Sequence, residues 1–209
     1  MPQTAKKTFE VSLIHYEGLC APPPVLPSQK EMFDYQIETL VGKGLAEYSD
    51  ADPFRNRIPE QGLFLIVPPP PKKLDLKELM AGVALDGRTG VNYFDASYLA
   101  DIGEYPATAS LLTDVEDGRG RLNTKPSISR QNIKGEKRHA YNTWRGIIHI
   151  TVFPWVLKHH YLDLVGARCS GDGVPCLCVG GGKPAIHRNG GGGALPNYGA
   201  PSAGSVIVP

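Results

Sequence analysis

The chain has 209 residues, of which 41% are hydrophobic and 21% are charged, a composition typical of a globular protein that can bury a sizeable core. The formal net charge of +1 excludes a globally basic nucleic-acid binder, so nucleic acid is not an expected partner. The longest apolar run, Leu63 to Val67, is too short to cross a bilayer, and charged residues interrupt the N-terminal stretch where a signal peptide would need apolar ones. We therefore expect a cytoplasmic protein without a membrane segment.

The N-terminal part is predicted to hold a strand, a stiff connector and a helix. Residues 8–16 read as a short strand, and the proline-rich residues 20–27 form a polyproline-like connector. A helix follows, because Ser28 and Glu31 have the spacing of a capping box and an apolar stripe runs through residues 33–41. Glycines after this stripe indicate its end.

Shorter elements are predicted in the middle of the chain. Residues 63–67 favour a buried strand, and residues 74–80 favour a short helix. Residues 110–115 indicate another strand. Asp117 and Gly118 supply the residue types of a tight hairpin turn, so the chain is expected to return as a strand from Arg121 onward.

The C-terminal half mixes clear and ambiguous patterns. Residues 127–134 favour a helix, with a proline near its start and a glycine at its end. Residues 146–153, GIIHITVF, suit either a buried strand or the second half of a helix that begins at Thr143. Residues 174–179 and 184–188 flank three glycines, which indicates a hairpin. The other glycine runs are interpreted as turns, and Pro68 to Lys73 as a stiff connector.

These elements predict an α+β fold, a single compact domain with a small antiparallel or mixed sheet packed against helices. Residues 28–209 would form that domain, with residues 1–27 as an N-terminal strand and proline-rich arm. A parallel doubly wound sheet is disfavoured, because strands and helices do not alternate at the required spacing. The alternative is a chain of two subdomains divided near Pro68–Pro71.

The cysteines raise the question of a metal site. Cys169, Cys176, Cys178 and His187 together offer a ligand set that tetrahedral zinc accepts, and a hairpin could bring them together. One residue separates Cys176 from Cys178, and we expect their side chains to point to opposite faces of a strand. We therefore predict no metal and no other cofactor, and interpret these cysteines as buried small residues.

Two groups of residues could support catalysis instead. Cys169 follows Arg168, whose charge would lower the pKa of the thiol and favour a nucleophilic thiolate, although no general base can be assigned to it. Asp114 and Glu116 share one face of a predicted strand and could act as an acid and base pair. An enzyme that uses either Cys169 or the two carboxylates is the alternative reading of function.

Charge is distributed unevenly along the chain. Residues 119–145 carry eight Lys or Arg residues and one acidic residue, so this segment has a net charge of +7 and the remainder −6. Aromatic residues are interleaved with these cations, which is typical of grooves for single-stranded nucleic acid and of pockets for small anions. We favour the pocket, and the alternative is a solvated face whose charges compensate the acidic remainder of the chain. The predicted ligand-binding residues are Arg121, Arg130, Arg138, Tyr141, Trp144 and Arg145.

The C-terminal half also resembles a known family. The segments LLTDVEDGRGRLNTKPS, GIIHITVFPWVL and LVGARCSGDGVPCLCVGGGKPAI, in this order, are similar to an uncharacterised bacterial family known only as a domain of unknown function, roughly two hundred residues long. The positions that match best are Asp114, Asp117, Gly118, Leu122, Asn123, Pro126, Pro154, Arg168, Cys169, Gly171, Val174 and Pro175. The resemblance extends from Gln36 to the end, and it implies a helix at residues 146–153. Cys176 and Cys178 depart from it, since the family has apolar residues there, and it brings no activity with it.

The function predicted on this basis is a non-catalytic binding or accessory protein. The expected partner is a small anionic ligand or another macromolecule, because the basic segment is present and no complete catalytic set is recognisable. Whether the protein also forms a homo-oligomer is left open.

Overall fold

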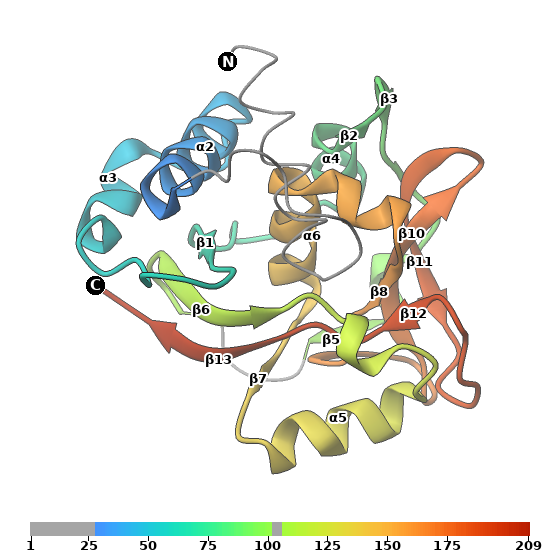
Figure 1. The fold of residues 1–209 in the computed structure, drawn as a ribbon. Helices are drawn as coiled ribbons and strands as arrows, with labels where there is room; N and C mark the ends of the chain where they lie inside the picture. Colours follow the sequence, from blue (N-terminus) through green and yellow to red (C-terminus); the bar gives the residue numbers. More distant parts are fainter. Residues whose placement is uncertain (1–27, 102–105) are drawn as a thin grey trace.

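A computed structural model describes residues 28–101 and 106–209 of the chain (Figure 1). The strand predicted at residues 8–16 and the connector at residues 20–27 lie outside the described residues. The helices are α2 (Gln29–Gly42), α3 (Tyr48–Ala51), η1 (Asp52–Phe54), α4 (Leu76–Gly82), η2 (Ala96–Tyr98), η3 (Arg119–Arg121), α5 (Pro126–Gly135), α6 (Thr143–Val152) and η4 (Pro154–Lys158). The strands are β1 (Leu65–Val67), β2 (Ala84–Leu85), β3 (Arg88–Thr89), β4 (Val91–Asn92), β5 (Leu99–Asp101), β6 (Ser110–Glu116), β7 (His139–Ala140), β8 (Tyr161–Asp163), β9 (Ala167–Cys169), β10 (Val174–Gly180), β11 (Lys183–Asn189), β12 (Tyr198–Gly199) and β13 (Ser202–Ile207).

Helix α2 begins and ends where its local sequence predicts. The backbone N–H of Glu31 donates to the Ser28 hydroxyl, and the backbone N–H of Ser28 donates to the Glu31 carboxylate at 2.6 Å, which completes the capping box. The buried Gln36 side chain joins α2 to β1, since it donates to the Phe64 carbonyl at 3.0 Å and accepts from the Ile66 N–H at 2.9 Å. Both polar groups of a buried amide are therefore satisfied.

Two larger sheets carry most of the strands. One is antiparallel, with the order β1-β6-β13-β7, and the other is mixed, with the order β12-β8-β10-β11-β4. Two smaller pairs, β2-β3 and β5-β9, complete the set in the described residues. This arrangement of sheets and helices is the α+β mix that the sequence predicts.

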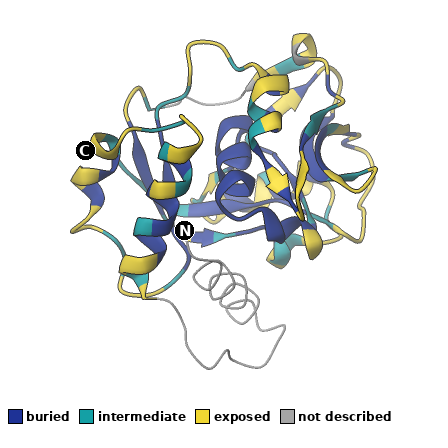
Figure 2. Cartoon of the chain, turned by 90° about the horizontal axis from the view of Figure 1, so that it is seen from above, coloured by how far each residue is buried: buried dark blue, intermediate teal, exposed yellow. Residues whose placement is uncertain are grey.

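Helix α6 lies between the two larger sheets (Figure 1). All of its residues are buried, and the interior elements are dark blue in Figure 2 while the outer turns are yellow. The buried residues of α6 include polar ones such as Arg145 and His149 as well as the apolar majority, so packing on all sides, and not an amphipathic pattern, sets its position. The helical interpretation of residues 146–153 is thus confirmed, with Thr143 as the first residue.

One predicted turn is wrong. Asp117 and Gly118 do not close a hairpin, because the chain continues into η3 and the neighbours of β6 are β1 and β13. Gly118 does have a positive φ of 108°, as the turn required. The sequence Asp117-Gly118 correctly predicts a positive φ at this position. Which strand lies next to β6, however, is decided by pairing with residues distant in the sequence.

The hairpin predicted around residues 180–182 is confirmed. Strands β10 and β11 pair antiparallel from Val174 opposite Asn189 to Gly180 opposite Lys183. Gly181 and Gly182 have φ values of 59° and 75°, which suit a tight two-residue turn and cost glycine little.

A continuous hydrophobic cluster joins residues on both sides of Pro68–Pro71, among them Phe33 before it and Trp144 after it. The Tyr35 hydroxyl also reaches across, donating to the Val152 carbonyl at 2.9 Å. These contacts cross the connector at which the two-subdomain alternative divides the chain. Among the helices of the described residues, none is long and apolar enough to span a membrane.

Candidate functional site

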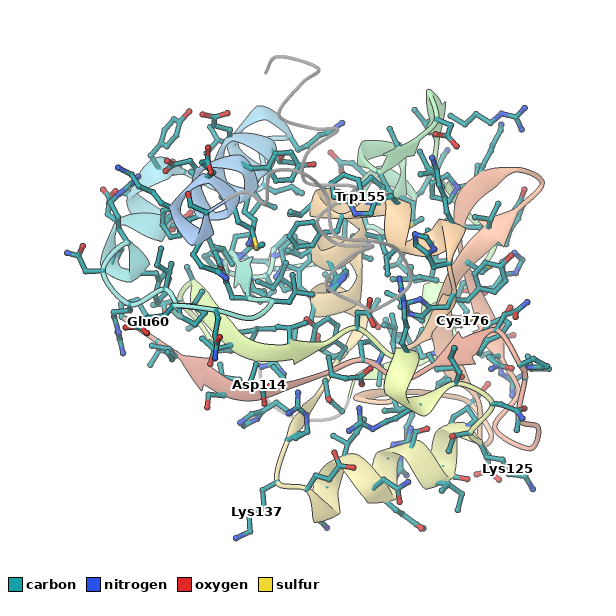
Figure 3. All side chains as sticks on the ribbon, in the orientation of Figure 1. Glu60, Asp114, Lys125, Lys137, Trp155 and Cys176 are labelled. Atoms are coloured by element: carbon teal, nitrogen blue, oxygen red, sulfur yellow. The ribbon has the colours of Figure 1, made fainter. Side chains whose placement is uncertain are left out.

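The basic segment, residues 119–145, forms four consecutive elements: η3, α5, β7 and the first turn of α6. Figure 3 labels Lys125 and Lys137, which mark the two ends of α5 at the bottom of the view. The buried residues of α5 are Pro126, Ser129 and Ile133, so its other faces present cations and amides to solvent. Whether these cations form a site depends on how many are neutralised by neighbours.

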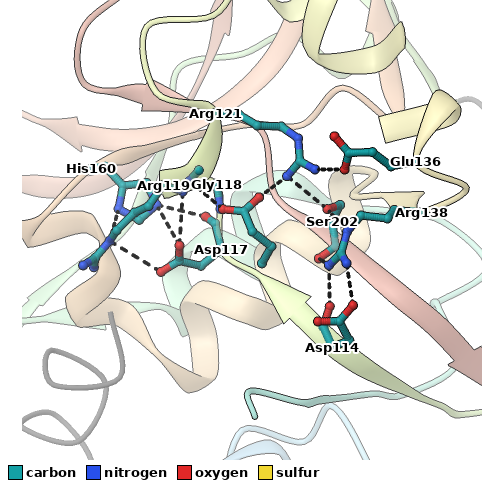
Figure 4. A network of polar contacts seen from close by, with 11 residues as sticks. Asp114, Asp117, Gly118, Arg119, Arg121, Glu136, Arg138, His160 and Ser202 are labelled. Carbon is teal, nitrogen blue, oxygen red and sulfur yellow. Dashed lines mark hydrogen bonds and ion pairs between the residues drawn. The ribbon is translucent and has the colours of Figure 1, made fainter. Parts of the chain in front are cut away.

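Arg121 is neutralised by two carboxylates. Its guanidinium forms ion pairs with Glu116 and Glu136, and it also donates to the Ser202 hydroxyl at 3.3 Å (Figure 4). Glu116 itself accepts from the backbone N–H groups of Gly118 and Gly120 at 2.8 and 2.9 Å. Arg121 thus stabilises a loop and is poorly placed to hold a ligand.

Arg138 is also paired, but it keeps access to a pocket. It forms an ion pair with Asp114 and donates from Nε to the Ser202 hydroxyl at 2.9 Å (Figure 4). Asp114 and Glu116, the two candidate catalytic carboxylates, are therefore each occupied by an arginine. Burial raises the pKa of Glu116 even though its hydrogen bonds and Arg121 act in the opposite direction.

A third polar cluster lies at the end of β6. Arg119 donates from Nε to His160 Nδ1 at 3.1 Å, and His160 Nε2 is 2.9 Å from the Asp117 carbonyl (Figure 4). Because Nδ1 accepts a hydrogen bond, the proton of the neutral imidazole is on Nε2 and donates to that carbonyl. Burial lowers the pKa of His160, so the neutral form is the one this cluster stabilises.

A pocket of about 560 Å³ opens beside α5, β7 and the start of α6, and we refer to it as the Arg145 pocket. No Asp or Glu is among the described residues that line it. Five cationic side chains line it: Arg130, Lys134, Lys137, Arg138 and Arg145. The pocket therefore has a positive potential, which focuses anions in a concave surface.

Arg145 is the most unusual of these cations. The residue is only 8% exposed, and its Nη1 donates to the Ala140 carbonyl at 3.3 Å. No ion pair between described residues includes Arg145, and burial lowers its pKa. It also lies in the first turn of α6, where the helix dipole disfavours a positive charge. Burial and the helix dipole thus both raise the free energy of the charged form of Arg145.

The electrostatic effect of Arg145 extends to its neighbour His139. The pKa of His139 is lowered, first by partial burial and second by the charge of Arg145. A neutral imidazole in this lining can accept or donate a hydrogen bond without adding charge. His139, like Lys134, Lys137 and Asn142, lines the pocket but was not among the predicted residues; its place in the basic segment was the only available signal.

Arg130 has a fixed orientation. Its Nε donates to the Val165 carbonyl at 2.7 Å and its Nη2 to the Ala167 carbonyl at 3.1 Å. Val165 lies in the turn between β8 and β9, and Ala167 is the first residue of β9. The guanidinium is therefore held by backbone groups that carry no net charge, so its own positive charge remains available.

The two predicted aromatic residues do not line this pocket. Tyr141 and Trp144 are 0% and 1% exposed and belong to the core. Trp144 donates from Nε1 to the Pro68 carbonyl at 2.8 Å, and the Tyr141 hydroxyl is 3.4 Å from His149 Nδ1. Of the six residues predicted from sequence, the structure thus brings together Arg130, Arg138 and Arg145.

The cysteine arrangement differs from the expectation. Cys176 and Cys178 point to the same face of β10, because side chains two residues apart in a strand lie on one side, and their thiols form a hydrogen bond. The hydrogen bond and burial raise the pKa of Cys176. His187 lies opposite Cys176 in the hairpin register. In the part of the chain that is described, no three His, Cys, Asp or Glu side chains are grouped as metal ligands.

Cys169, the candidate nucleophile, lies in β9 and is 4% exposed. A thiol at this depth is less accessible than a catalytic nucleophile has to be. Cys20 lies outside the described residues.

Comparison with known proteins gives one match. A model of a family described as a family of unknown function, DUF5701, matches residues 30–192. No curated protein and no solved structure matches the chain. The matched region includes α5, β7 and α6, and thus every residue of the Arg145 pocket named above.

Proposed function

Since the chain belongs to the DUF5701 family of unknown function, we propose from its own geometry that it is a binding protein whose Arg145 pocket holds a small anionic ligand. The observation that carries this proposal is the buried Arg145 guanidinium, which forms no ion pair with a carboxylate of the described residues. A charge of this kind is costly unless a counter-charge accompanies it, and an anion in the pocket would supply one.

The neighbouring groups fit the same role. Arg130 is oriented by two carbonyls, and Lys134 and Lys137 add exposed ammonium groups to the rim. Phosphate and carboxylate oxygens accept the paired N–H donors of a guanidinium in a fixed geometry. The proposal is therefore for a ligand with at least one phosphate or carboxylate group.

We place this function in the cytoplasm. Cys176 and Cys178 are buried thiols that form no disulfide, a state that a reducing compartment maintains. Small phosphorylated and carboxylated molecules are suitable ligands there.

The test is a thermal-shift titration of the full chain with inorganic phosphate and citrate at constant ionic strength. A ligand at a hundred times its dissociation constant stabilises the native state by about 2.7 kcal/mol, so a clear rise in the midpoint is expected. Arg145→Met should lose that rise. Lys77→Met, which removes an exposed cation far from the pocket in α4, is the matched control and should keep it.

A second readout separates loss of binding from loss of folding. Without ligand, Arg145→Met should be at least as stable as the original chain, because the substitution removes a buried charge from the first turn of a helix. If neither anion raises the midpoint, or if Arg145→Met responds like the control variant, the pocket does not hold an anion.

A further inference from the structure

We propose that the ligand carries two separated phosphate groups and spans α5, with its second phosphate in another basic pocket. This inference rests on the proposed function, because the Arg145 pocket provides the first phosphate site. The second pocket has a volume of about 520 Å³, and we refer to it as the Arg168 pocket. Arg130 lines both pockets.

The Arg168 pocket is also cationic. Lys125, Arg130 and Arg168 line it, against the single carboxylate of Asp172. Lys125 and Arg168 are exposed, so their charges cost little to keep in the absence of a ligand. Burial lowers the pKa of Arg130, repulsion from the nearby Arg168 adds to this effect, and Asp172 opposes it. A phosphate between the two arginines would relieve that repulsion.

Glycines form part of the lining of this pocket: Gly171, Gly191 and Gly192. At Gly191 the missing side chain lets the backbone pack against Asp172, since a Cβ there would lie 1.9 Å from the Asp172 carbonyl oxygen. At Gly192 no atom lies within 4 Å of the Cβ position, so the backbone is open to a ligand there. The glycine run that sequence reading treats as a flexible turn thus forms part of a pocket wall.

Arg130 is suited to join the two phosphates. Two of its nitrogens donate to the Val165 and Ala167 carbonyls, and no described acceptor is hydrogen-bonded to its Nη1. A guanidinium that is already immobilised loses little side-chain entropy when it binds a ligand. Arg130 would therefore hold the middle of an extended ligand, with Arg145 at one side and Arg168 at the other.

Helix geometry sets the required separation. The Arg168 pocket includes Lys125 and Ser127, and the Arg145 pocket includes Lys134 and Lys137, so the two pockets lie toward opposite ends of α5. Lys125 and Lys134 are nine residues apart in the sequence, so at a rise of about 1.5 Å per residue they are separated by roughly 14 Å along the helix axis. A ligand with its phosphates joined by a linker fits this distance better than a single phosphate.

The test uses isothermal titration of the full chain at constant ionic strength with phosphate, with tripolyphosphate, which is too short to reach both pockets, and with decane-1,10-diyl bisphosphate, whose flexible linker can span them. We expect the affinity to rise by about tenfold from phosphate to the bisphosphate, which corresponds to one added charge-assisted contact. Arg168→Gln should bind phosphate within about twofold of the original chain but lose the gain with the bisphosphate. Lys77→Gln, the matched control, should keep the gain, which separates a local contact from general attraction of polyanions.

The outcomes distinguish this inference from the proposed function. If phosphate binds and Arg145→Met abolishes it, but Arg168→Gln keeps the full gain with the bisphosphate, the Arg145 pocket is real and the second phosphate site is wrong. If Lys77→Gln loses as much of the gain as Arg168→Gln, the second site is also wrong. If phosphate does not bind at all, or binds Arg145→Met unchanged, the proposed function itself fails.

Discussion

At the scale of single residues, Asp163 shows how burial converts into a dependence of stability on pH. Its side chain is buried in β8, accepts from Asn189 Nδ2 at 2.9 Å, and has its pKa raised to about 6 by burial. In the unfolded chain the pKa returns to about 3.8. The folded state therefore holds the proton more tightly, and ionisation costs stability as the pH rises from about 4 to 6.

Asp163→Asn removes that cost and retains an oxygen that can accept from Asn189. We expect the variant to exceed the original chain in free energy of unfolding by up to about 3 kcal/mol at pH 7, with the advantage vanishing near pH 4. Urea denaturation of both proteins across this pH range measures the difference. A difference that stays constant with pH would show that Asp163 does not titrate as its burial requires.

At the scale of residues, the sequence identifies the cations of residues 119–145 but not the carboxylates that pair with them. The segment 119–145 is correctly identified as basic, yet its charge count includes neither Glu116 nor Asp114, which neutralise Arg121 and Arg138. Those carboxylates lie in β6, just outside the segment. Tyr141 and Trp144 were expected to line the ligand site, but their apolar area is buried in the core.

At the scale of elements, the turn after β6 depends on a glycine. Gly118 has a φ of 108°, and a Cβ there would lie 2.9 Å from the Gly199 carbonyl oxygen at the end of β12. Gly118→Ala should therefore lower the free energy of unfolding by about 2 kcal/mol, through both backbone strain and the contact. Thermal denaturation gives the measurement.

Gly42→Ala is the matched control for this prediction. Gly42 is the last residue of α2, and an added Cβ there meets no atom within 4 Å. Alanine has the higher helix propensity, so this variant should be neutral or slightly more stable. Equal losses at both positions would mean that Gly118 is not constrained as described.

Elements with strong local signals are the ones that sequence predicts well. The capping box of α2 and the glycine turn between β10 and β11 are set by neighbouring residues, so they are visible in a short window. Strand β13 has no such signal: its sequence SAGSVI follows glycine-rich residues and was not predicted as a strand. Its place between β6 and β7 comes from pairing with distant residues.

At the scale of the whole molecule, the shared core predicts one cooperative unfolding transition. Tyr35 in α2 donates to the Val152 carbonyl in α6 and lies 6.3 Å from the ring of Phe153, across the proline connector. Tyr35→Phe leaves that carbonyl without its partner and should cost about 1–2 kcal/mol.

Two probes decide between one domain and two. Tryptophan fluorescence reports Trp144 and Trp155, which both follow the connector, while far-ultraviolet circular dichroism reports all the helices, including α2. We expect coincident transitions for the original chain, and an equal shift of both midpoints in Tyr35→Phe. Separate transitions, or a shift seen by only one probe, would support two subdomains.

The position of β13 also has a consequence for folding during synthesis. Strand β6 lies between β1, which precedes it in the chain, and β13, which ends at Ile207. A ribosome delivers residues from the N-terminus onward, so β6 must wait with one edge unpaired until residue 207 has left the exit tunnel. The four-stranded sheet can close only after nearly all of this chain has emerged, and the nascent protein needs protection of that edge during the interval.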